Sequence, residues 1–369
     1  MNALTDYTSY PMLLAFVLLV AGCQPKASSP AVAAPRVLPE SFLRGMTFAH
    51  EGYRGHNGYG GDLVGPSMDS LNRLGANAIS VVPYTFMRGE GRVDSLPIPE
   101  HYGAENDSAV LGCIRKAHDR GLQVMLKPQI WVRGSWPGDI DYASEDDWAA
   151  FFRAYERWIL HYARMAEREN IHSLCIGTEL RYATLKHPER WRSMIAAIRE
   201  EYHGTLTYAA NWGEEFENLT FWDALDVMGL NSYYPLSVED EPSDSTLRQG
   251  ALAWMRMADG LSRAHDRPYW LTEVGFRSVE RAWQNPHAEA GEREASLAAQ
   301  RRCYEALAAA VCSSERLEGM FIWKWPSYLG HQEDREGRRT GFVPGGKPAG
   351  EVLQYLYRMP PKEGATGAE

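Results

Sequence analysis

From residue 42 onward, short apolar runs alternate with longer segments whose apolar residues recur at helical spacing. The segment 67–74 predicts a helix that ends at Gly75, and 78–82 (AISVV) predicts a buried strand. The same order returns as a helix over 108–120, then Gly121, then a strand over 123–128. Glycine suits both helix ends, because the residue after a helix often takes the left-handed conformation. Continuous apolar strands that alternate with helices predict a parallel sheet covered by helices.

Eight strands of this kind can be counted, and eight strand–helix units predict a closed barrel rather than an open sheet. A helix is predicted from Ser144, which with Asp147 resembles a capping box, and an aromatic stripe along it predicts a buried face. The predicted fold class is therefore α/β, a single (β/α)₈ TIM barrel over 41–358. A Gly-x-Gly-x-x-Gly motif after a strand, the mark of a dinucleotide fold, is missing from the sequence. The remaining strands are predicted at 46–48, 173–176, 206–209, 226–230, 269–272 and 320–323.

The beginning of the chain has a different pattern. Residues 12–22 (MLLAFVLLVAG) form an apolar run that is too short to cross a bilayer and is typical of the core of a signal peptide. Cys23 follows in an arrangement that resembles a bacterial lipobox, although the residues before the run include Asp6 and no Lys or Arg, unlike a usual signal peptide. The resemblance implies a lipid on Cys23, and Gln24 after it implies sorting to the outer membrane. We therefore expect a signal peptide over 1–22 and a lipid-anchored protein of the bacterial cell envelope.

The segments that flank the barrel are polar and irregular. Residues 24–40 are rich in Pro, Ala and Ser, so we expect lipidated Cys23 and a flexible tether over 23–40. We expect a disordered tail over 359–369. The other cysteines lack Cys-x-x-Cys spacing, which leaves two interpretations: buried free thiols, or one disulfide between the last two. These cysteines are Cys113, Cys175, Cys303 and Cys312.

Composition narrows the classes of partner. The 369 residues carry 38 Lys and Arg against 48 Asp and Glu, a net charge of −10, without a long basic run. Binding to nucleic acid needs clustered cations, so we expect none, whereas 12 Trp and 19 Tyr suit a neutral sugar substrate. His-Glu-x-x-His is missing, and the acidic cluster around Asp139 lacks the spacing of a calcium loop, so we expect no metal and no cofactor. The sequence also has no Gly-x-Ser-x-Gly elbow for ester hydrolysis.

Two predicted strands end in glutamate. The fourth ends CIGTEL with Glu179, and the seventh ends LTEVGF with Glu273. Catalytic groups of such barrels lie at the carboxyl ends of strands, so both side chains should reach the same mouth. Either one alone could be a salt-bridged carboxylate at the rim. Together, two facing carboxylates are what hydrolysis of a glycosidic bond requires.

These glutamates and their surroundings resemble the retaining glycosidases of clan A, and most closely glycoside hydrolase family 113, whose characterised members are β-mannanases. The resemblance implies that Glu179 is the acid/base, that Glu273 is the nucleophile, and that Tyr233 is a hydrogen-bonding neighbour of the nucleophile. Two departures are Thr178, where clan A often has Asn, and Gln129, where better-known mannanases have His. The resembling stretches are 45–60, 70–87, 124–140, 176–180, 229–236, 271–276, 322–326 and 341–349.

Further residues at strand ends are candidates for binding the sugar. Trp323 and Trp325 share one face of the eighth strand by the period of two, and we expect one of them to lie under the cleaved sugar. Glu179 must be protonated to act as an acid, so burial and the charge of Glu273 should raise its pKa. The candidates for hydroxyl contacts at the rim are His50, Lys127, Trp131, Asn211, Trp212 and Asn231.

The sequence thus predicts a retaining, endo-acting glycoside hydrolase, with β-1,4-mannanase as the leading interpretation. The alternatives are another retaining β-glycanase, such as a glucanase or galactanase, and a lipid-anchored glycan-binding protein without activity. We expect a polysaccharide or oligosaccharide as substrate, attachment to the membrane through the N-terminal lipid, and a monomer.

Overall fold

The computed structural model describes residues 37–49, 58–89, 96–99, 105–330 and 339–359. The predicted signal peptide, Cys23, most of the tether, His50 and all of the predicted tail after residue 359 lie outside the described residues. Within the described ranges, no helix is both long enough and apolar enough to cross a membrane.

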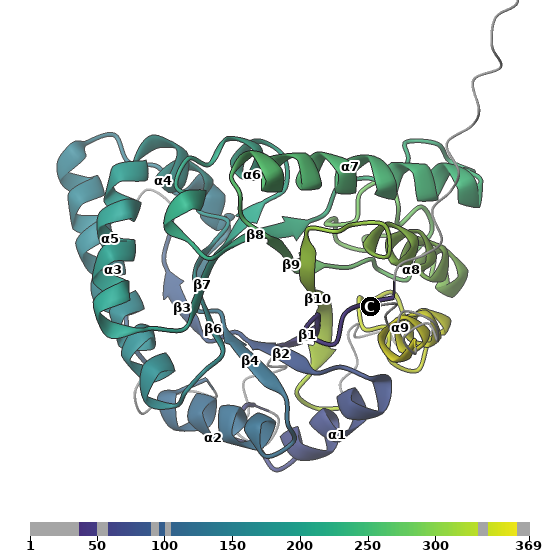
Figure 1. The fold of residues 1–369 in the computed structure, drawn as a ribbon, viewed down its shortest axis with the longest axis horizontal. Helices are drawn as coiled ribbons and strands as arrows, with labels where there is room; N and C mark the ends of the chain where they lie inside the picture. Colours follow the sequence, from purple (N-terminus) through teal and green to yellow (C-terminus); the bar gives the residue numbers. More distant parts are fainter. Residues whose placement is uncertain (1–36, 50–57, 90–95, 100–104, 331–338, 360–369) are drawn as a thin grey trace, which may run out of the picture. The chain divides into compact units, whose positions relative to one another are not determined.

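Eight parallel strands close into a barrel in the order β1-β10-β9-β8-β7-β6-β4-β2 (Figure 1). This confirms the predicted (β/α)₈ architecture, and each predicted strand overlaps one of the eight. The strands are β1 (Leu43–Ala49), β2 (Ala78–Val81), β4 (Gln123–Leu126), β6 (Ser173–Thr178), β7 (Thr205–Asn211), β8 (Val227–Ser232), β9 (Tyr269–Val274) and β10 (Leu317–Pro326).

Helices surround the barrel on its outer face (Figure 1). Helix α3 begins as predicted, because Ser144 Oγ accepts a hydrogen bond from the Asp147 amide at 3.1 Å. Helix α1 ends at Gly75, which has a φ of +98°. The helices are α1 (Val64–Leu74), α2 (Asp107–His118), α3 (Glu145–Arg168), α4 (Arg181–Lys186), α5 (Pro188–Glu201), α6 (Glu214–Asn218), α7 (Asp244–Ala264), α8 (Leu297–Val311) and α9 (Pro348–Arg358), with 3₁₀ turns at Pro137–Asp139 and Trp222–Ala224.

The apolar core has two parts. The larger lies between strands and helices and includes the aromatic stripe of α3, which the sequence predicted as buried. The smaller is a separate cluster with one side chain from each strand of the barrel, which fits the layered interior of this fold. Cys113, Cys175, Cys303 and Cys312 are buried free thiols, so the first of the two cysteine interpretations holds. The smaller cluster consists of Leu43, Ala78, Met125, Cys175, Ala209, Val227, Trp270 and Phe321.

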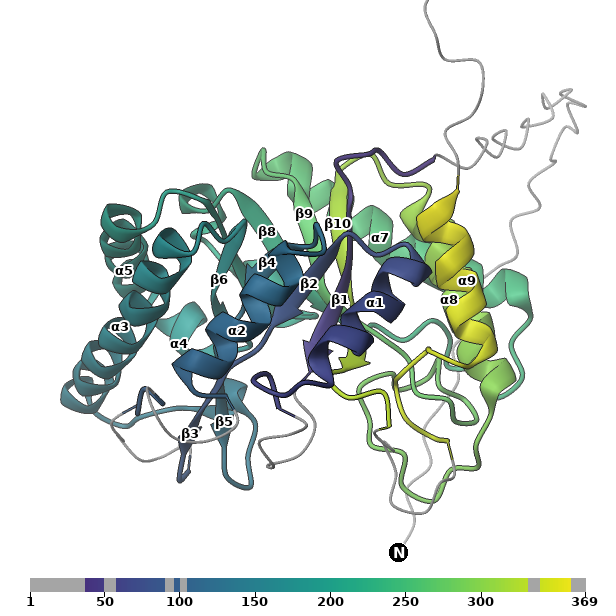
Figure 2. The same ribbon diagram turned by 90° about the horizontal axis from the view of Figure 1, so that it is seen from below.

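Two short strands outside the barrel were not predicted. Strands β3 (Tyr84–Met87) and β5 (Gln129–Val132) pair in parallel as a separate two-stranded sheet. They follow Pro83 and Pro128, and proline cannot donate to a strand ladder, so the prolines separate them from β2 and β4. Figure 2 shows β3 and β5 projecting beyond the barrel.

Candidate active site

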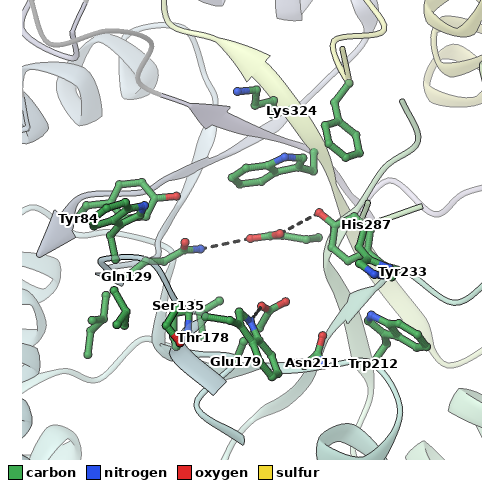
Figure 3. A pocket seen from close by; sticks show the side chains of 18 of the residues that line it. Tyr84, Gln129, Ser135, Thr178, Glu179, Asn211, Trp212, Tyr233, His287 and Lys324 are labelled. Carbon is green, nitrogen blue, oxygen red and sulfur yellow. Dashed lines mark hydrogen bonds between the residues drawn. The ribbon is translucent and has the colours of Figure 1, made fainter. Parts of the chain in front are cut away.

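A cleft of about 780 Å³ opens at the carboxyl ends of the barrel strands. Both predicted catalytic glutamates line it, together with side chains from several strand ends and the loops that follow them (Figure 3). The lining residues are Tyr84, Gln129, Ile130, Trp131, Val132, Ser135, Trp136, Pro137, Thr178, Glu179, Asn211, Trp212, Tyr233, Glu273, Arg277, His287, Glu289, Trp323, Lys324 and Phe342.

Glu179 follows the last residue of β6 and has a φ of +53°, in the left-handed region. This conformation costs a non-glycine residue about 1–3 kcal/mol and is found mainly where the surrounding structure enforces it, often at active sites. Here the Glu179 amide still donates to the Ala209 carbonyl at 2.9 Å. Its carboxylate accepts hydrogen bonds from Trp136 Nε1 at 2.6 Å and from Asn231 Nδ2 at 3.0 Å.

The environment of Glu179 favours its protonated form. Burial raises the pKa of Glu179, and the charge of Glu273 raises it further. The hydrogen bonds from Asn231 and Trp136 act in the opposite direction, because they stabilise the carboxylate. The net shift is upward, which suits a group that must donate a proton near neutral pH.

Glu273 lies on β9 and is 6% exposed. Lys127 Nζ donates to Glu273 Oε1 at 2.5 Å and Gln129 Nε2 donates to the same oxygen at 3.2 Å. Tyr233 OH donates to Oε2 at 3.0 Å. In Figure 3 the dashed bonds of Gln129 and Tyr233 approach one carboxylate from opposite sides. These three donors, one of them the Lys127 cation, hold the carboxylate in place.

Tyr233 occupies the position that the family resemblance implied, beside Glu273. Its pKa is raised well above the usual value by burial, and then by the charges of Glu273 and Glu179. The phenol therefore keeps its proton and remains a hydrogen-bond donor to the carboxylate.

Lys127 and Asn231 do not lie at the rim, where we had expected them. Both side chains are fully buried below the cleft and contact the glutamates. Thr272 Oγ1 donates to Asn231 Oδ1 at 2.9 Å, which fixes the amide so that its NH₂ group faces Glu179. The sequence placed these residues at the correct strand ends, but their role is to hold the carboxylates.

A buried carboxyl supports the loop that carries Glu179. Glu215 on α6 is fully buried and accepts hydrogen bonds from Tyr208 OH at 2.7 Å, Thr184 Oγ1 at 2.8 Å and the Asn211 amide at 2.7 Å. Tyr208 OH in turn accepts from the Leu180 amide, directly after Glu179, at 2.7 Å. Burial raises the pKa of Glu215 to about 7 despite these three donors.

The two tryptophans of β10 separate, contrary to the expectation that they share a face. Trp323 lines the cleft, whereas Trp325 is 5% exposed and donates from Nε1 to Ser67 Oγ at 3.2 Å. Met46 pairs with Ile322 and Phe48 with Trp325, so two residues of β10 oppose one residue of β1. Such a bulge interrupts the alternation of faces. Trp325 is therefore part of the core in this structure.

The remaining sequence candidates that the structure describes line the cleft. Trp131 stands on one side, on β5, and Asn211 and Trp212 stand at the end of β7. The Trp212 ring lies 5.3 Å from the ring of Tyr234 and 5.7 Å from that of His287. His50 lies outside the described residues.

Sequence reasoning missed Trp136 and Glu215 and noted Gln129 only as a departure from the family. Trp136 precedes the turn Pro137–Asp139, in a loop with no regular periodicity, so its contact with Glu179 had no local signal. Gln129 begins β5, in which buried residues alternate with more exposed ones, and this alternation is typical of a strand. Among the described residues, no group of three or more His, Cys, Asp and Glu side chains is arranged to hold a metal ion.

The closed (β/α)₈ barrel carries two buried glutamates at its carboxyl-terminal mouth. The pKa of Glu179 is raised, and Glu273 is held by hydrogen-bond donors. These features define the class of glycoside-hydrolase barrels with paired carboxylates. The family model of Glycoside Hydrolase Family 113 matches residues 46–347. The chain belongs to this family and is a glycoside hydrolase.

Solved structures share the fold of this chain. A family 113 β-mannanase from Alicyclobacillus acidocaldarius, in complex with ManMIm, is 29% identical, with a TM-score of 0.75 over 86% of this chain and 97% of that chain. A family 113 β-1,4-mannanase is 23% identical, with a TM-score of 0.76 over 86% and 99%. A family 5 mannosidase from Rhizomucor miehei is 12% identical, with a TM-score of 0.61 over 86% and 92%. No curated protein sequence matches the chain.

Proposed function

We propose that this protein is a retaining, endo-acting β-1,4-mannanase. The observation that carries the proposal is the opposite environment of the two glutamates: Glu179 has a raised pKa, and Glu273 accepts hydrogen bonds from Lys127, Gln129 and Tyr233. One group is thereby prepared to donate a proton and the other to attack as a carboxylate.

The chemistry follows from this division. The Glu273 carboxylate attacks the anomeric carbon while Glu179 transfers its proton to the glycosidic oxygen, so the bond to the leaving sugar breaks and a glycosyl ester forms on Glu273. Glu179, now ionised, then takes a proton from water. The resulting hydroxide adds to the anomeric carbon and displaces Glu273, which restores both groups. Two inversions give net retention of configuration.

We propose mannan as the substrate because this chain matches the family 113 β-mannanase from Alicyclobacillus acidocaldarius over 97% of that chain, at 29% identity. The endo mode of action is supported by the aromatic side chains that separate elements bring to the cleft, Trp131 on β5 and Trp212 after β7, because such side chains suit the binding of more than one sugar unit.

The test is the release of reducing ends from β-1,4-mannan, β-glucans and galactans, together with the anomeric form of the first product by NMR. The proposal expects mannan to be the best substrate, internal cleavage, and a β-anomer as first product. Preference for glucan or galactan would reject the mannanase assignment, an α-anomer would reject retention, and binding without turnover would favour the glycan-binding alternative.

We further propose that the protein is anchored to the bacterial outer membrane through a lipid on Cys23. Support comes from the sequence alone: an apolar run over 12–22 directly before Cys23, and a Pro-, Ala- and Ser-rich tether after it. Such an anchor would hold the barrel near the cell surface, where polymeric glycans are met.

A further inference from the structure

The small sheet formed by β3 and β5 has one buried face and one open face. Tyr84 pairs with Gln129, and Phe86 pairs with Trp131. Side chains alternate along a strand, so these four lie on the same face. The residues between and beyond them are between 1% and 5% exposed and fill the opposite face; they are Thr85, Met87, Ile130 and Val132.

The open face begins at the nucleophile. Gln129 Nε2 donates to Glu273 Oε1 at 3.2 Å, and Tyr84, Gln129 and Trp131 all line the cleft. Figure 3 shows Tyr84 beside Gln129 at one side of the site. Trp131 follows Gln129 by two residues, which places it about 7 Å further along the strand. The face is therefore a strip that continues the cleft outward.

The outer end of the strip is a pair of exposed aromatic side chains. Phe86 is 51% exposed and Trp131 is 47% exposed. Their ring centroids are 5.8 Å apart and the rings are inclined by 58°. The two rings therefore form a small exposed apolar patch at the end of the strip.

We propose that Phe86 and Trp131 form a distal subsite that binds the main chain of an uncharged polysaccharide beyond the catalytic subsites. The inference rests on the proposed glycanase function. The ring faces suit the C–H faces of a pyranose, and the strip leads a chain from Glu273 to this pair. Phe86 itself does not line the catalytic cleft, so its contribution depends on the length of the substrate.

The experiment compares Phe86→Ala and Trp131→Ala with the wild type on two substrates: the polymer that the wild type cleaves best, and a short aryl glycoside of the same sugar. The ratio of kcat/KM on the polymer to kcat/KM on the short substrate should fall about tenfold, mainly through KM on the polymer. Phe86→Tyr keeps the ring and should restore the ratio.

Tyr355→Ala is the matched control, because Tyr355 is an aromatic residue on α9 that is 71% exposed and does not line the cleft. This variant should keep the wild-type ratio. A second measurement is retention on the insoluble polymer by the inactive Glu273→Ala variant, with and without Phe86→Ala; the added substitution should weaken retention.

The failures are distinguishable. If the wild type cleaves the polymer but Phe86→Ala leaves the ratio and the retention unchanged, the subsite is rejected and the proposed function stands. Equal losses on both substrates would also reject the subsite. If the wild type cleaves no polysaccharide, the proposed function itself fails.

Discussion

Lys127 Nζ lies 2.5 Å from Glu273 Oε1, and the lysine side chain is completely buried. The pair joins the end of β4 to β9 across the interior of the barrel. Removing one partner of a buried ion pair leaves an uncompensated charge, which typically costs about 3–5 kcal/mol. The pair therefore links the position of Glu273, the proposed nucleophile, to the stability of the fold.

Lys127→Met should lower both activity and stability. We expect kcat to fall at least about 100-fold, because the carboxylate loses the cation that holds its charge and position. The melting temperature should fall as well. The control is Arg192→Ala, which breaks an exposed pair with Asp223 and should cost no more than about 1 kcal/mol. Wild-type kcat and melting temperature in Lys127→Met would contradict this account.

Trp136→Phe should move the alkaline limb of the pH profile of kcat/KM to higher pH. Glu179 must be protonated to act, so activity is lost as pH rises through its pKa. The indole of Trp136 donates to the carboxylate and lowers that pKa, so removing the donor raises it. Trp325→Phe removes an indole N–H that donates to Ser67 instead, and should leave the limb in place. A shift to lower pH in Trp136→Phe would contradict the assignment.

The two glutamates should differ in their response to substitution. Glu273→Ala should abolish turnover on every substrate, because no glycosyl ester can form. Glu179→Ala should be severe on a polysaccharide but milder on an activated aryl glycoside, whose leaving group needs little protonation. Azide should partly rescue Glu179→Ala and give a glycosyl azide of retained configuration. Equal losses on both kinds of substrate would show that Glu179 is not the acid.

Glu215→Gln should change how stability depends on pH. The folded-state pKa of Glu215 is about 7, above the usual carboxyl value, so the folded protein binds its proton more tightly than the unfolded chain does. The resulting stabilisation is complete below about pH 4.5 and is lost as pH rises to about 7, a change of about 3 kcal/mol.

Urea unfolding at several pH values measures this effect. As pH rises from about 4.5 to about 7, the free energy of unfolding of the wild type should decrease relative to that of Glu215→Gln. Parallel curves for the two proteins would contradict the shift. Glu215→Gln should also lower activity, because the amide NH₂ group of Gln would face one of the three hydrogen-bond donors that Glu215 now accepts from. One of these donors, Tyr208 OH, also accepts from the Leu180 amide directly after Glu179.

Cys23→Ser tests the proposed anchor. The variant should leave the membrane fraction, while activity on a soluble substrate should be unchanged, because residue 23 lies before the barrel. Fractionation of cells followed by an activity assay measures both quantities. A variant that stays with the membrane would reject lipid attachment at Cys23.

The fold and the two glutamates could be predicted because their signals are local. Each barrel strand is a short apolar run, and Glu179 and Glu273 follow or end such runs. Strand ends at one mouth of a closed barrel converge without further information. The depth of a side chain is not local, which is why Lys127 and Asn231 were placed at the rim although both are buried.

Other errors have particular causes. A bulge in β10 changes the face of Trp325, and an alternating pattern cannot reveal where two residues oppose one. Trp136 reaches Glu179 from 43 positions earlier in the chain, through a loop whose path depends on its neighbours. Strands β3 and β5 had a readable pattern of alternation, Tyr-Thr-Phe-Met and Gln-Ile-Trp-Val, but each is only four residues long.

The pairing of β3 with β5 outside the closed ring has a consequence for protein engineering. These strands hydrogen-bond to each other as a separate sheet, so exchanging Phe86 or Trp131 at the outer end of their open face leaves the register of the barrel unchanged. Exposed substitutions of this kind usually change stability by no more than about 0.5 kcal/mol. Positions 86 and 131 are therefore suitable for a combinatorial library, in which binding of the polymer can be selected while the hydrolytic centre keeps its geometry.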